Sequence, residues 1–228
     1  MIEDSSPATG VAPSFSAVDA DEPLIVIADD NVDQREAMEE LFDSVAIETL
    51  TFANARVLLD SPLPDRPGCF ILDVRMPGPS GLDLQAQLVE KGQLMPIIFV
   101  TGHGDVPMSI RAIKAGAFDF KTKPVRDQDL LDAATTAIEA DRSRRAIHRV
   151  AQDSLARFSS LSARERQVLE LIVGGSLNKQ IAYELGVTEV TIKLHRGNVM
   201  KKMGVRSIAE LVRMWDHIPS PFRRGDAG

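Results

Sequence analysis

The sequence predicts a doubly wound α/β domain with a five-stranded parallel sheet, followed by a small all-α domain. In the first part of the chain, apolar runs of four to five residues alternate with helix-like segments, as expected for buried parallel strands joined by crossover helices. In the last part, short helical segments are separated by glycines, a pattern typical of a compact helical bundle. A chain of 228 residues has room for two small domains.

The strands of the α/β domain are expected at five places. Three buried runs, at residues 24–28, 69–72 and 96–100, each end at polar or glycine-containing sequence. A fourth run follows at residues 117–120, and a weaker strand is expected at residues 48–52. These runs supply the five strands of the predicted sheet.

The helices of the α/β domain are expected at residues 34–43, 82–91, 106–115 and 128–138. Strands and helices together define a domain over residues 23–140. In a doubly wound sheet, ligands bind at the carboxyl ends of the strands, so we look for the functional site there. Residues 1–22 are rich in Ser, Ala, Pro and Asp and show no periodicity, which indicates a disordered leader.

The all-α domain is expected over residues 159–217. Its helices are predicted at residues 162–173, 177–185, 188–203 and 207–215. The charged stretch at residues 141–158 carries apolar residues at Ile147, Val150 and Leu155, which indicates a helical linker that continues the preceding helix. Residues 218–228 are expected to form a flexible tail.

Charge is divided unevenly along the chain. The formal net charge is −7, yet residues 159–228 hold 11 Lys and Arg against 7 Asp and Glu, a net charge of +4. This distribution indicates an acidic domain that handles a cation or phosphate, joined to a module that binds a polyanion.

No apolar stretch approaches the roughly 20 residues of a membrane span, so we expect a cytoplasmic protein with no membrane partner. The single cysteine, Cys69, lies in an apolar run and is expected to be a buried thiol.

Three acidic residues are predicted to meet at one edge of the sheet. Asp29 and Asp30 follow the first strand, and Asp73 follows the third. Such a cluster of hard oxygen ligands, partly open to water and phosphate, suits Mg²⁺. Adjacent acids at a strand end are also common as solvated turn residues, and this alternative stays open for the Asp29–Asp30 pair taken alone.

A hydroxyl and an ammonium group are predicted at the same edge. Thr101 ends the fourth strand, and Lys123 ends the fifth. A carboxylate nucleophile, a divalent cation, a lysine and a hydroxyl are the parts that phosphoryl transfer needs. The sequence therefore favours phosphoryl chemistry at this edge.

This set of residues resembles the receiver domain of response regulators, which has a flavodoxin/CheY-like fold. The set comprises Asp29-Asp30, Asp73, Met76-Pro77-Gly78, Thr101, Ala115-Gly116-Ala117 and Lys123-Pro124. The resemblance implies that Asp73 accepts the phosphoryl group, that Asp30 and Asp73 bind Mg²⁺ directly, and that Asp29 acts mainly through water. It also implies that the backbone carbonyl of Arg75 is a metal ligand.

The same resemblance implies roles for residues on the last two strands. Thr101 is expected to bind a phosphoryl oxygen, Lys123 to pair with the phosphate, and the Lys123–Pro124 peptide to be cis. Phe120 corresponds to the family's rotating aromatic residue, or else it is a permanently buried phenylalanine, and both interpretations stay open. His103, in a loop with glycine on either side, is interpreted as a surface residue and not as a phosphorelay histidine.

The last domain carries a helix-turn-helix pattern. Ser162 and Glu165 form a capping box, and the segments 177–182, 185–187 and 188–203 predict a helix, a tight turn and a longer helix. The pattern resembles the LuxR-type domain of FixJ/NarL response regulators in the strings Leu161-Ser162-Ala163-Arg164-Glu165, Asn178-Lys179-Gln180-Ile181-Ala182 and Thr191-Ile192-Lys193-Leu194-His195-Arg196.

This second resemblance implies a set of DNA contacts. Lys193 and Leu194 are expected to reach bases, whereas the residues that mainly hold phosphates are Asn178, Lys179, Arg196 and Lys201. Gly197 shares a helix face with Lys193, Leu194 and Lys201, and its lack of bulk permits a close approach to the major groove. Trp215 is interpreted as a packing residue and not as a platform for a base.

The two motif sets predict a phosphorylation-dependent transcriptional regulator of a two-component system. The expected partners are a sensor histidine kinase, double-stranded operator DNA, a second copy of the chain after phosphorylation, and RNA polymerase. A regulator that works without phosphate is a weaker alternative, because it would need a broken pocket.

The alternative from another class is an enzyme, a haloacid-dehalogenase-like phosphatase. Such enzymes usually carry a second acid two residues past the nucleophile, where this chain has Arg75. We therefore expect no enzymatic activity beyond the receiver's own phosphoryl transfer and slow dephosphorylation.

Overall fold

The computed structural model of the chain describes residues 21–102, 106–219 and 222. The chain divides into two compact units, with the boundary between Arg142 and Ser143. The predicted leader up to residue 20, His103, and most of the predicted tail lie outside the described residues. Within the described residues, no helix is long and apolar enough to cross a membrane.

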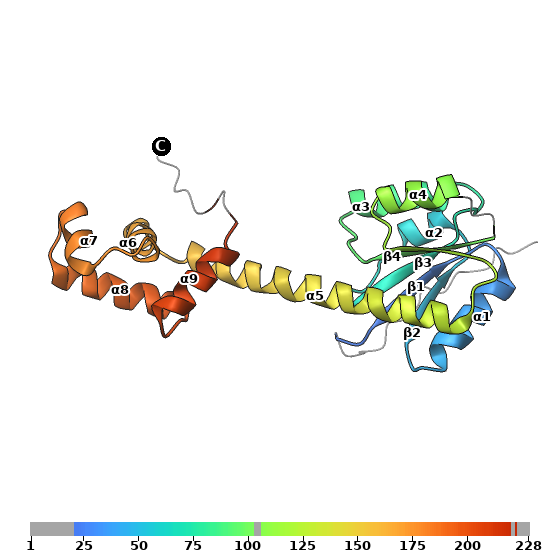
Figure 1. The fold of residues 1–228 in the computed structure, drawn as a ribbon, viewed down its shortest axis with the longest axis horizontal. Coiled ribbons are helices and arrows are strands. Elements are labelled where there is room, and N and C mark those ends of the chain that lie inside the picture. The colour runs from blue at the N-terminus through green and yellow to red at the C-terminus, as the bar shows by residue number, and fades with distance from the viewer. Residues whose placement is uncertain (1–20, 103–105, 220–221, 223–228) are drawn as a thin grey trace, which may run out of the picture. The chain divides into compact units, whose positions relative to one another are not determined.

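The first unit contains one sheet of five parallel strands, which confirms the predicted fold class (Figure 1). The strand order is β2-β1-β3-β4-β5. All residues of β1, β3 and β4 are buried, as the apolar runs predict. The strands are β1 (Leu24–Ala28), β2 (Glu48–Phe52), β3 (Gly68–Leu72), β4 (Ile97–Thr101) and β5 (Asp119–Thr122).

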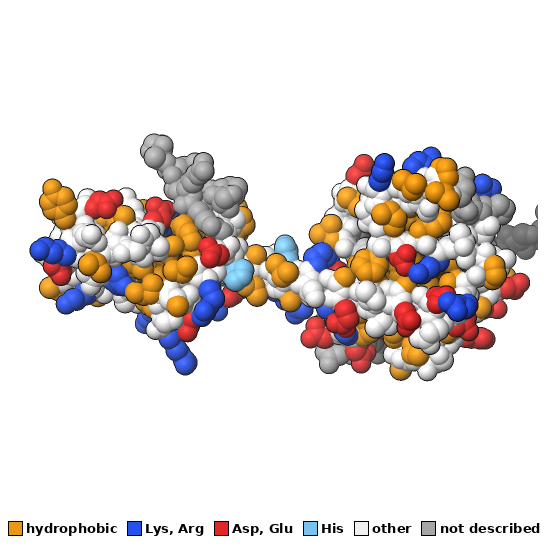
Figure 2. Space-filling model, viewed as in Figure 1, with side chains coloured by type: hydrophobic (Ala, Val, Ile, Leu, Met, Phe, Trp, Pro, Cys, Tyr) orange, Lys and Arg blue, Asp and Glu red, His pale blue; other side chains and the backbone are white. Residues whose placement is uncertain are grey.

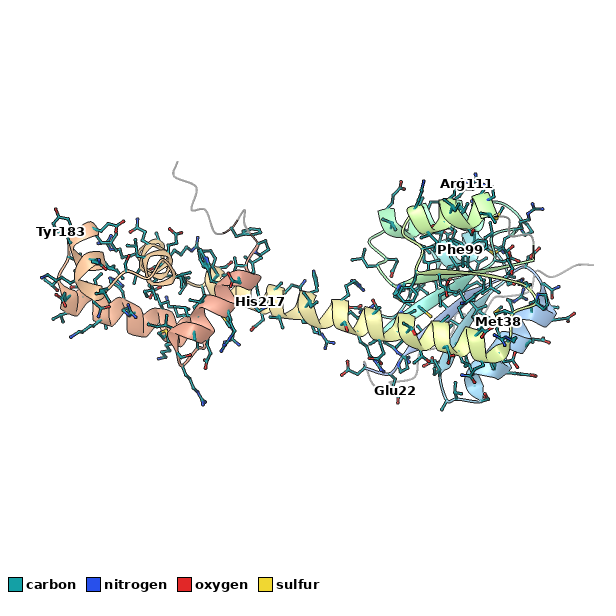
Figure 3. The ribbon with its side chains drawn as sticks, viewed as in Figure 1. Glu22, Met38, Phe99, Arg111, Tyr183 and His217 are labelled. Carbon is teal, nitrogen blue, oxygen red and sulfur yellow. The ribbon has the colours of Figure 1, made fainter. Side chains whose placement is uncertain are left out.

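Helices cover both faces of this sheet, as Figure 1 shows. Their bounds are α1 (Val32–Asp43), α2 (Ala55–Asp60), α3 (Gly81–Glu90), α4 (Val106–Lys114) and α5 (Asp127–Ser159). Helices α1 and α5 pack with the sheet around one apolar cluster that includes Met38, and α2, α3 and α4 pack around a second cluster that includes Phe99. Figure 3 shows these two side chains on opposite faces of the sheet.

Two elements of this unit differ from the sequence prediction. Strand β5 begins at Asp119 and not at residue 117, because Ala117 still donates a backbone hydrogen bond to Ala112 and so closes the turn after α4. Helix α2 was not predicted. It has only six residues, too few for helical periodicity to be visible, and its start is fixed by the side chain of Asn54.

Helix α5 is continuous from Asp127 to Ser159, and residues 141–158 are part of it. Within the first unit, the buried carboxylate of Asp141 accepts a hydrogen bond of 3.1 Å from the backbone N–H of Gly68 and so ties α5 to the start of β3. The neighbouring thiol of Cys69 is buried, as predicted, and burial followed by the charge of Asp141 raises its pKa to about 12.

The second unit is all-helical, as predicted. Beyond the end of α5 it contains α6 (Ala163–Val173), α7 (Asn178–Glu184), α8 (Glu189–Met203) and α9 (Ile208–His217), and the predicted capping box of Ser162 and Glu165 opens α6. Its core includes Val168, Leu169, Ile181, Ile192, Val199, Met203 and Leu211. The ring of Trp215 meets that of Phe158 edge-on at 5.8 Å between centroids, which confirms a packing contact for the tryptophan.

Candidate functional site

The residues predicted to form the pocket all lie at the carboxyl ends of strands. Asp29 follows β1, Asp73 follows β3, Thr101 is the last residue of β4, and Lys123 follows β5. Strands β1 and β3 are neighbours on either side of the point where the strand order reverses, which is where doubly wound sheets place their ligands.

The three acids form a compact cluster. One carboxylate oxygen each from Asp29, Asp30 and Asp73 lies within 4.8 Å of the others. Asp29 is 1% exposed and Asp73 is 9% exposed, whereas Asp30 is open to solvent. The cluster is therefore set in the protein on one side and accessible on the other.

Lys123 bridges two of these acids. Its Nζ lies 2.5 Å from Oδ2 of Asp29 and 3.1 Å from Oδ2 of Asp73. Burial lowers the pKa of the Lys123 ammonium, but the hydrogen bonds and charges of Asp29 and Asp73 outweigh burial, so the pKa is raised. The ammonium stays charged and offsets part of the negative charge. The Lys123–Pro124 peptide is cis, as the resemblance implies.

The donor set fits a hard divalent cation. Both oxygens of Asp29 already accept hydrogen bonds, Oδ1 from the backbone N–H of Asn31 at 2.9 Å and Oδ2 from Lys123. Asp30 is exposed beside them, and Oδ1 of Asp73 accepts from the backbone N–H of Arg75 at 3.1 Å. Oxygen ligands with an open, wet side are the surroundings in which Mg²⁺ keeps several of its waters.

Two residues that support the pocket were missed by sequence reasoning. Arg35, on α1, donates a hydrogen bond of 2.7 Å to the backbone carbonyl of Asp29. A Cβ at Gly81 would lie 2.4 Å from the backbone oxygen of Asp73, so only glycine lets α3 begin this close to the acid. Gly81 is visible in the sequence three residues after the Met76-Pro77-Gly78 turn. Its close approach to Asp73 is a tertiary contact, which the sequence does not reveal.

Thr101 and Phe120 lie on neighbouring strands at the far side of the pocket. Thr101 is fully buried, whereas Phe120 is half-buried and its ring lies 6.3 Å from that of Phe99. The core therefore encloses only part of the Phe120 side chain. Beside it is a hollow of about 470 Å³, lined by Val106, Ser109, Phe120, Lys121, Thr122, Pro124, Val125, Arg126 and Asp129.

One face of α4 carries a row of exposed apolar side chains, beside the exposed Arg111 and Lys114. Val106, Ile110 and Ile113 are 71%, 47% and 47% exposed, and their spacing of four and three residues places them on one face of the helix. Figure 2 shows hydrophobic side chains gathered over α4. This surface adjoins the hollow beside Phe120, since Val106 belongs to both.

The residues predicted to contact DNA all lie on α7 and α8, which are joined by the turn around Gly186. The side chains of Lys179, Lys193, Leu194 and Lys201 are exposed, whereas Asn178 and Arg196 are half-buried. Arg196 follows the buried Ile192 by four residues, so it lies on the flank of α8 that turns towards the core.

Comparison with known proteins identifies the class. Residues 25–135 match the response regulator receiver domain, and residues 159–215 match the bacterial regulatory proteins of the luxR family. The chain therefore belongs to the response regulators that join a receiver to a LuxR-type DNA-binding domain, as both resemblances predicted. It is a transcriptional regulator of a two-component system, and its family is one of regulators and not of phosphatases.

Relatives match the chain over both units. Nodulation protein W of Bradyrhizobium diazoefficiens is 48% identical over 84% of each chain. Response regulator protein TmoT of Ectopseudomonas mendocina is 45% identical over 89% of this chain and 92% of its own. The solved structure of the response regulator StyR is similar at 44% identity and a TM-score of 0.80, covering 86% of this chain and 98% of that one.

Proposed function

We propose that Asp73 accepts a phosphoryl group from a sensor histidine kinase and that its phosphorylation strengthens binding to operator DNA. The observation that carries this proposal is the position of Asp73, which is 9% exposed, belongs to the acidic cluster and lies 3.1 Å from the ammonium of Lys123. We assign phosphoryl transfer to residues 23–140 and DNA binding to residues 159–217, joined by the helical linker at 141–158.

In the proposed transfer, an Asp73 carboxylate oxygen attacks phosphorus in line, the bond from phosphorus to the kinase histidine nitrogen breaks, and an acyl phosphate forms. Mg²⁺, when bound by Asp30, Asp73 and the backbone carbonyl of Arg75, with Asp29 acting through water, neutralises charge on the phosphoryl oxygens. Thr101 and Lys123 hold the remaining oxygens. Because the side chain two residues past Asp73 is an arginine, no carboxylic acid is there to speed hydrolysis, and the phosphoryl group persists.

The proposed signal passes from Thr101 to Phe120. A new phosphoryl oxygen draws the Thr101 hydroxyl inward, and the half-buried Phe120 ring then turns into the vacated space. Phe120 and Val106 both line the hollow described above, so a turn of the ring alters the surface next to the exposed face of Val106, Ile110 and Ile113. We infer that this face of α4 and β5 pairs with the same face of a second copy after phosphorylation.

At the DNA end, we assign base contacts to Lys193 and Leu194 and phosphate contacts to Asn178, Lys179, Arg196 and Lys201. Pairing of two receivers raises the effective concentration of the second DNA-binding domain at its half-site, so affinity can increase about 10² to 10⁴-fold without a new base contact. RNA polymerase is the proposed next partner, and the cytoplasm the proposed place of action.

Sedimentation and DNA binding test this function together. The full chain, treated with Mg²⁺ and acetyl phosphate, should sediment as a dimer and bind two half-sites much more tightly than the untreated chain. A single half-site should respond weakly. A phosphorylated monomer with stronger half-site binding would contradict dimerisation and indicate that phosphorylation relieves an inhibition.

A further inference from the structure

Helix α8 carries two opposite faces. Ile192, Val199 and Met203 are fully buried and face the core. On the other side, exposed residues recur at spacings of four, three and four residues, which at about 100° per residue places them in one row opposite the core. This exposed row consists of Val190, Leu194, Gly197 and Lys201.

The row contains an apolar pair that the fold does not use. Val190 is 76% exposed and Leu194 is 65% exposed, and their spacing of four residues makes them neighbours on the helix surface. Single exposed apolar residues are common and need no explanation. Two adjacent ones on the outward face of a recognition helix offer a small apolar surface to whatever that helix contacts.

Gly197 gives an independent indication that a partner approaches this row. A glycine inside a helix lowers helix stability relative to alanine. An added Cβ at Gly197 would meet no atom within 4 Å, so packing among the described residues does not require a glycine there. The missing side chain leaves the backbone of α8 open next to Leu194.

The charge around the row selects the kind of partner. Lys193 and Lys201 are exposed, and in the described part of the chain neither has an ion-pair partner. Lys202, by contrast, pairs with Glu165 at 2.6 Å and belongs to the side of the helix that faces the domain. Cations beside an uncharged, apolar row suit the major groove of DNA, where phosphates border the groove and thymine presents a methyl group.

We propose that Val190 and Leu194 form an apolar pair that recognises thymine 5-methyl groups in the operator, and that Val190 is a specificity-determining residue. The inference rests on the proposed function, because it requires α8 to enter the major groove. It adds Val190 to the proposed base contacts. It also predicts that the preferred half-site has thymine at the base pairs that Val190 and Leu194 contact.

Replacing thymidine by deoxyuridine tests the inference, because the exchange removes only the 5-methyl group. The full chain, treated with Mg²⁺ and acetyl phosphate, is first used to select duplexes from a randomised library. The preferred duplex is then remade with deoxyuridine at each thymidine in turn. At one or two positions the wild-type protein should lose about fourfold in affinity, the equivalent of about 0.8 kcal/mol for one buried methyl group.

Val190→Ala should bind the thymidine and deoxyuridine duplexes equally at the position that Val190 reads. Val190→Ile, which keeps an apolar branched side chain, should retain the discrimination. Val89→Ala is the matched control, since Val89 is an exposed helical valine of the receiver, and it should discriminate as the wild type does. Alanine favours the helix at least as well as valine, so loss of α8 does not complicate the result.

Each outcome bears on a distinct claim. A selected site without thymine, or a wild-type protein indifferent to deoxyuridine, would overturn the inference while leaving DNA binding intact. Unchanged discrimination by Val190→Ala would remove Val190 from base reading. Loss of transcription in Val190→Ala with unchanged DNA binding would assign the row to RNA polymerase instead. No sequence preference at all would overturn the proposed base contacts as well.

Discussion

Nζ of Lys123 lies 3.1 Å from Oδ2 of Asp73, close enough for a direct ion pair between the two side chains. The same ammonium also contacts Asp29, so one cation offsets the charge of two buried carboxylates. A phosphoryl group on Asp73 would bring further negative charge to this position, where the lysine is already in place to pair with it.

Lys123→Ala should slow the labelling of Asp73 by acetyl phosphate by about 10²-fold, because a preorganised cation no longer stabilises charge that develops on the phosphoryl oxygens. Mg²⁺ affinity, measured by calorimetry, should be retained or increased, since the acids lose a competing cation. Lys121→Ala is the control: Lys121 lies on β5 and pairs with Asp119 instead. Equal labelling rates in the two variants would contradict the role given to Lys123.

Lys193→Ala and Lys179→Ala should weaken DNA binding in different ways. A base contact distinguishes sequences, so Lys193→Ala should reduce the preference for the selected site by a factor that corresponds to about 1–3 kcal/mol. A phosphate contact does not distinguish sequences, so Lys179→Ala should lower the affinity for all sequences alike and reduce the salt dependence of binding. Competition binding with selected and random duplexes measures both. If both variants bound DNA with wild-type affinity and preference, the assignment of this surface of α7 and α8 to DNA binding would be wrong.

Gly197→Ala should separate stability from DNA binding. The added methyl group meets no atom within 4 Å, so α8 should gain about 0.5–1 kcal/mol of stability relative to glycine. The same methyl group stands between the helix backbone and the groove, so DNA affinity should fall. The single tryptophan, Trp215, reports unfolding of this unit by fluorescence.

Gly204→Ala is the matched comparison for Gly197→Ala. Gly204 ends α8 at a positive φ of 68°, and a Cβ there would collide with the guanidinium of Arg157. This variant should therefore lose stability. A Gly197→Ala protein that is destabilised, or that binds DNA as tightly as the wild type, would contradict the account of the exposed row.

The pH dependence of stability in the second unit should depend on Glu165. The hydrogen bond from Lys202, followed by that from the backbone of Ser162, lowers the pKa of this carboxyl in the folded state. Its stabilising contribution is therefore present above the unfolded pKa of about 4.3 and is lost as pH falls through the lower folded value. Denaturant unfolding followed at Trp215 across this range should show the loss in the wild type.

Glu165→Gln should flatten this pH dependence, because the amide does not titrate. Lys202→Met should reduce it, because the largest cause of the lowered pKa is removed. A Glu165→Gln protein whose stability falls with pH as steeply as that of the wild type would show that another group is responsible.

The sequence predicted most of the fold because three of the five strands, β1, β3 and β4, are buried along their whole length. Continuous apolar runs such as Leu24–Ala28 can hardly be anything else between helical segments, and the acids at their ends mark the site. Strand β5 was misplaced because its residues are only half-buried, so hydrophobicity does not mark its limits. Helix α2 is stabilised by its cap and by tertiary packing of Leu58, neither of which gives a periodic pattern.

The supporting residues of the pocket could not be predicted because their roles depend on contacts between distant backbone segments. Arg35 acts through the carbonyl of Asp29, so its effect is independent of any side-chain motif. The need for glycine at position 81 arises only when α3 begins beside the oxygen of Asp73. The proposed role of Val190 could not be predicted for another reason: the sequence does not reveal that this helical valine is exposed.

Phosphorylation of Asp73 tests the central claim most directly. The full chain is incubated with Mg²⁺ and acetyl phosphate and examined by intact-mass and peptide mass spectrometry, beside Asp73→Asn and a sample with the metal chelated. One hydroxylamine-sensitive phosphoryl group should appear on Asp73 of the wild type and in neither control. Equal labelling of Asp73→Asn, or undiminished labelling after chelation, would contradict the account of the pocket.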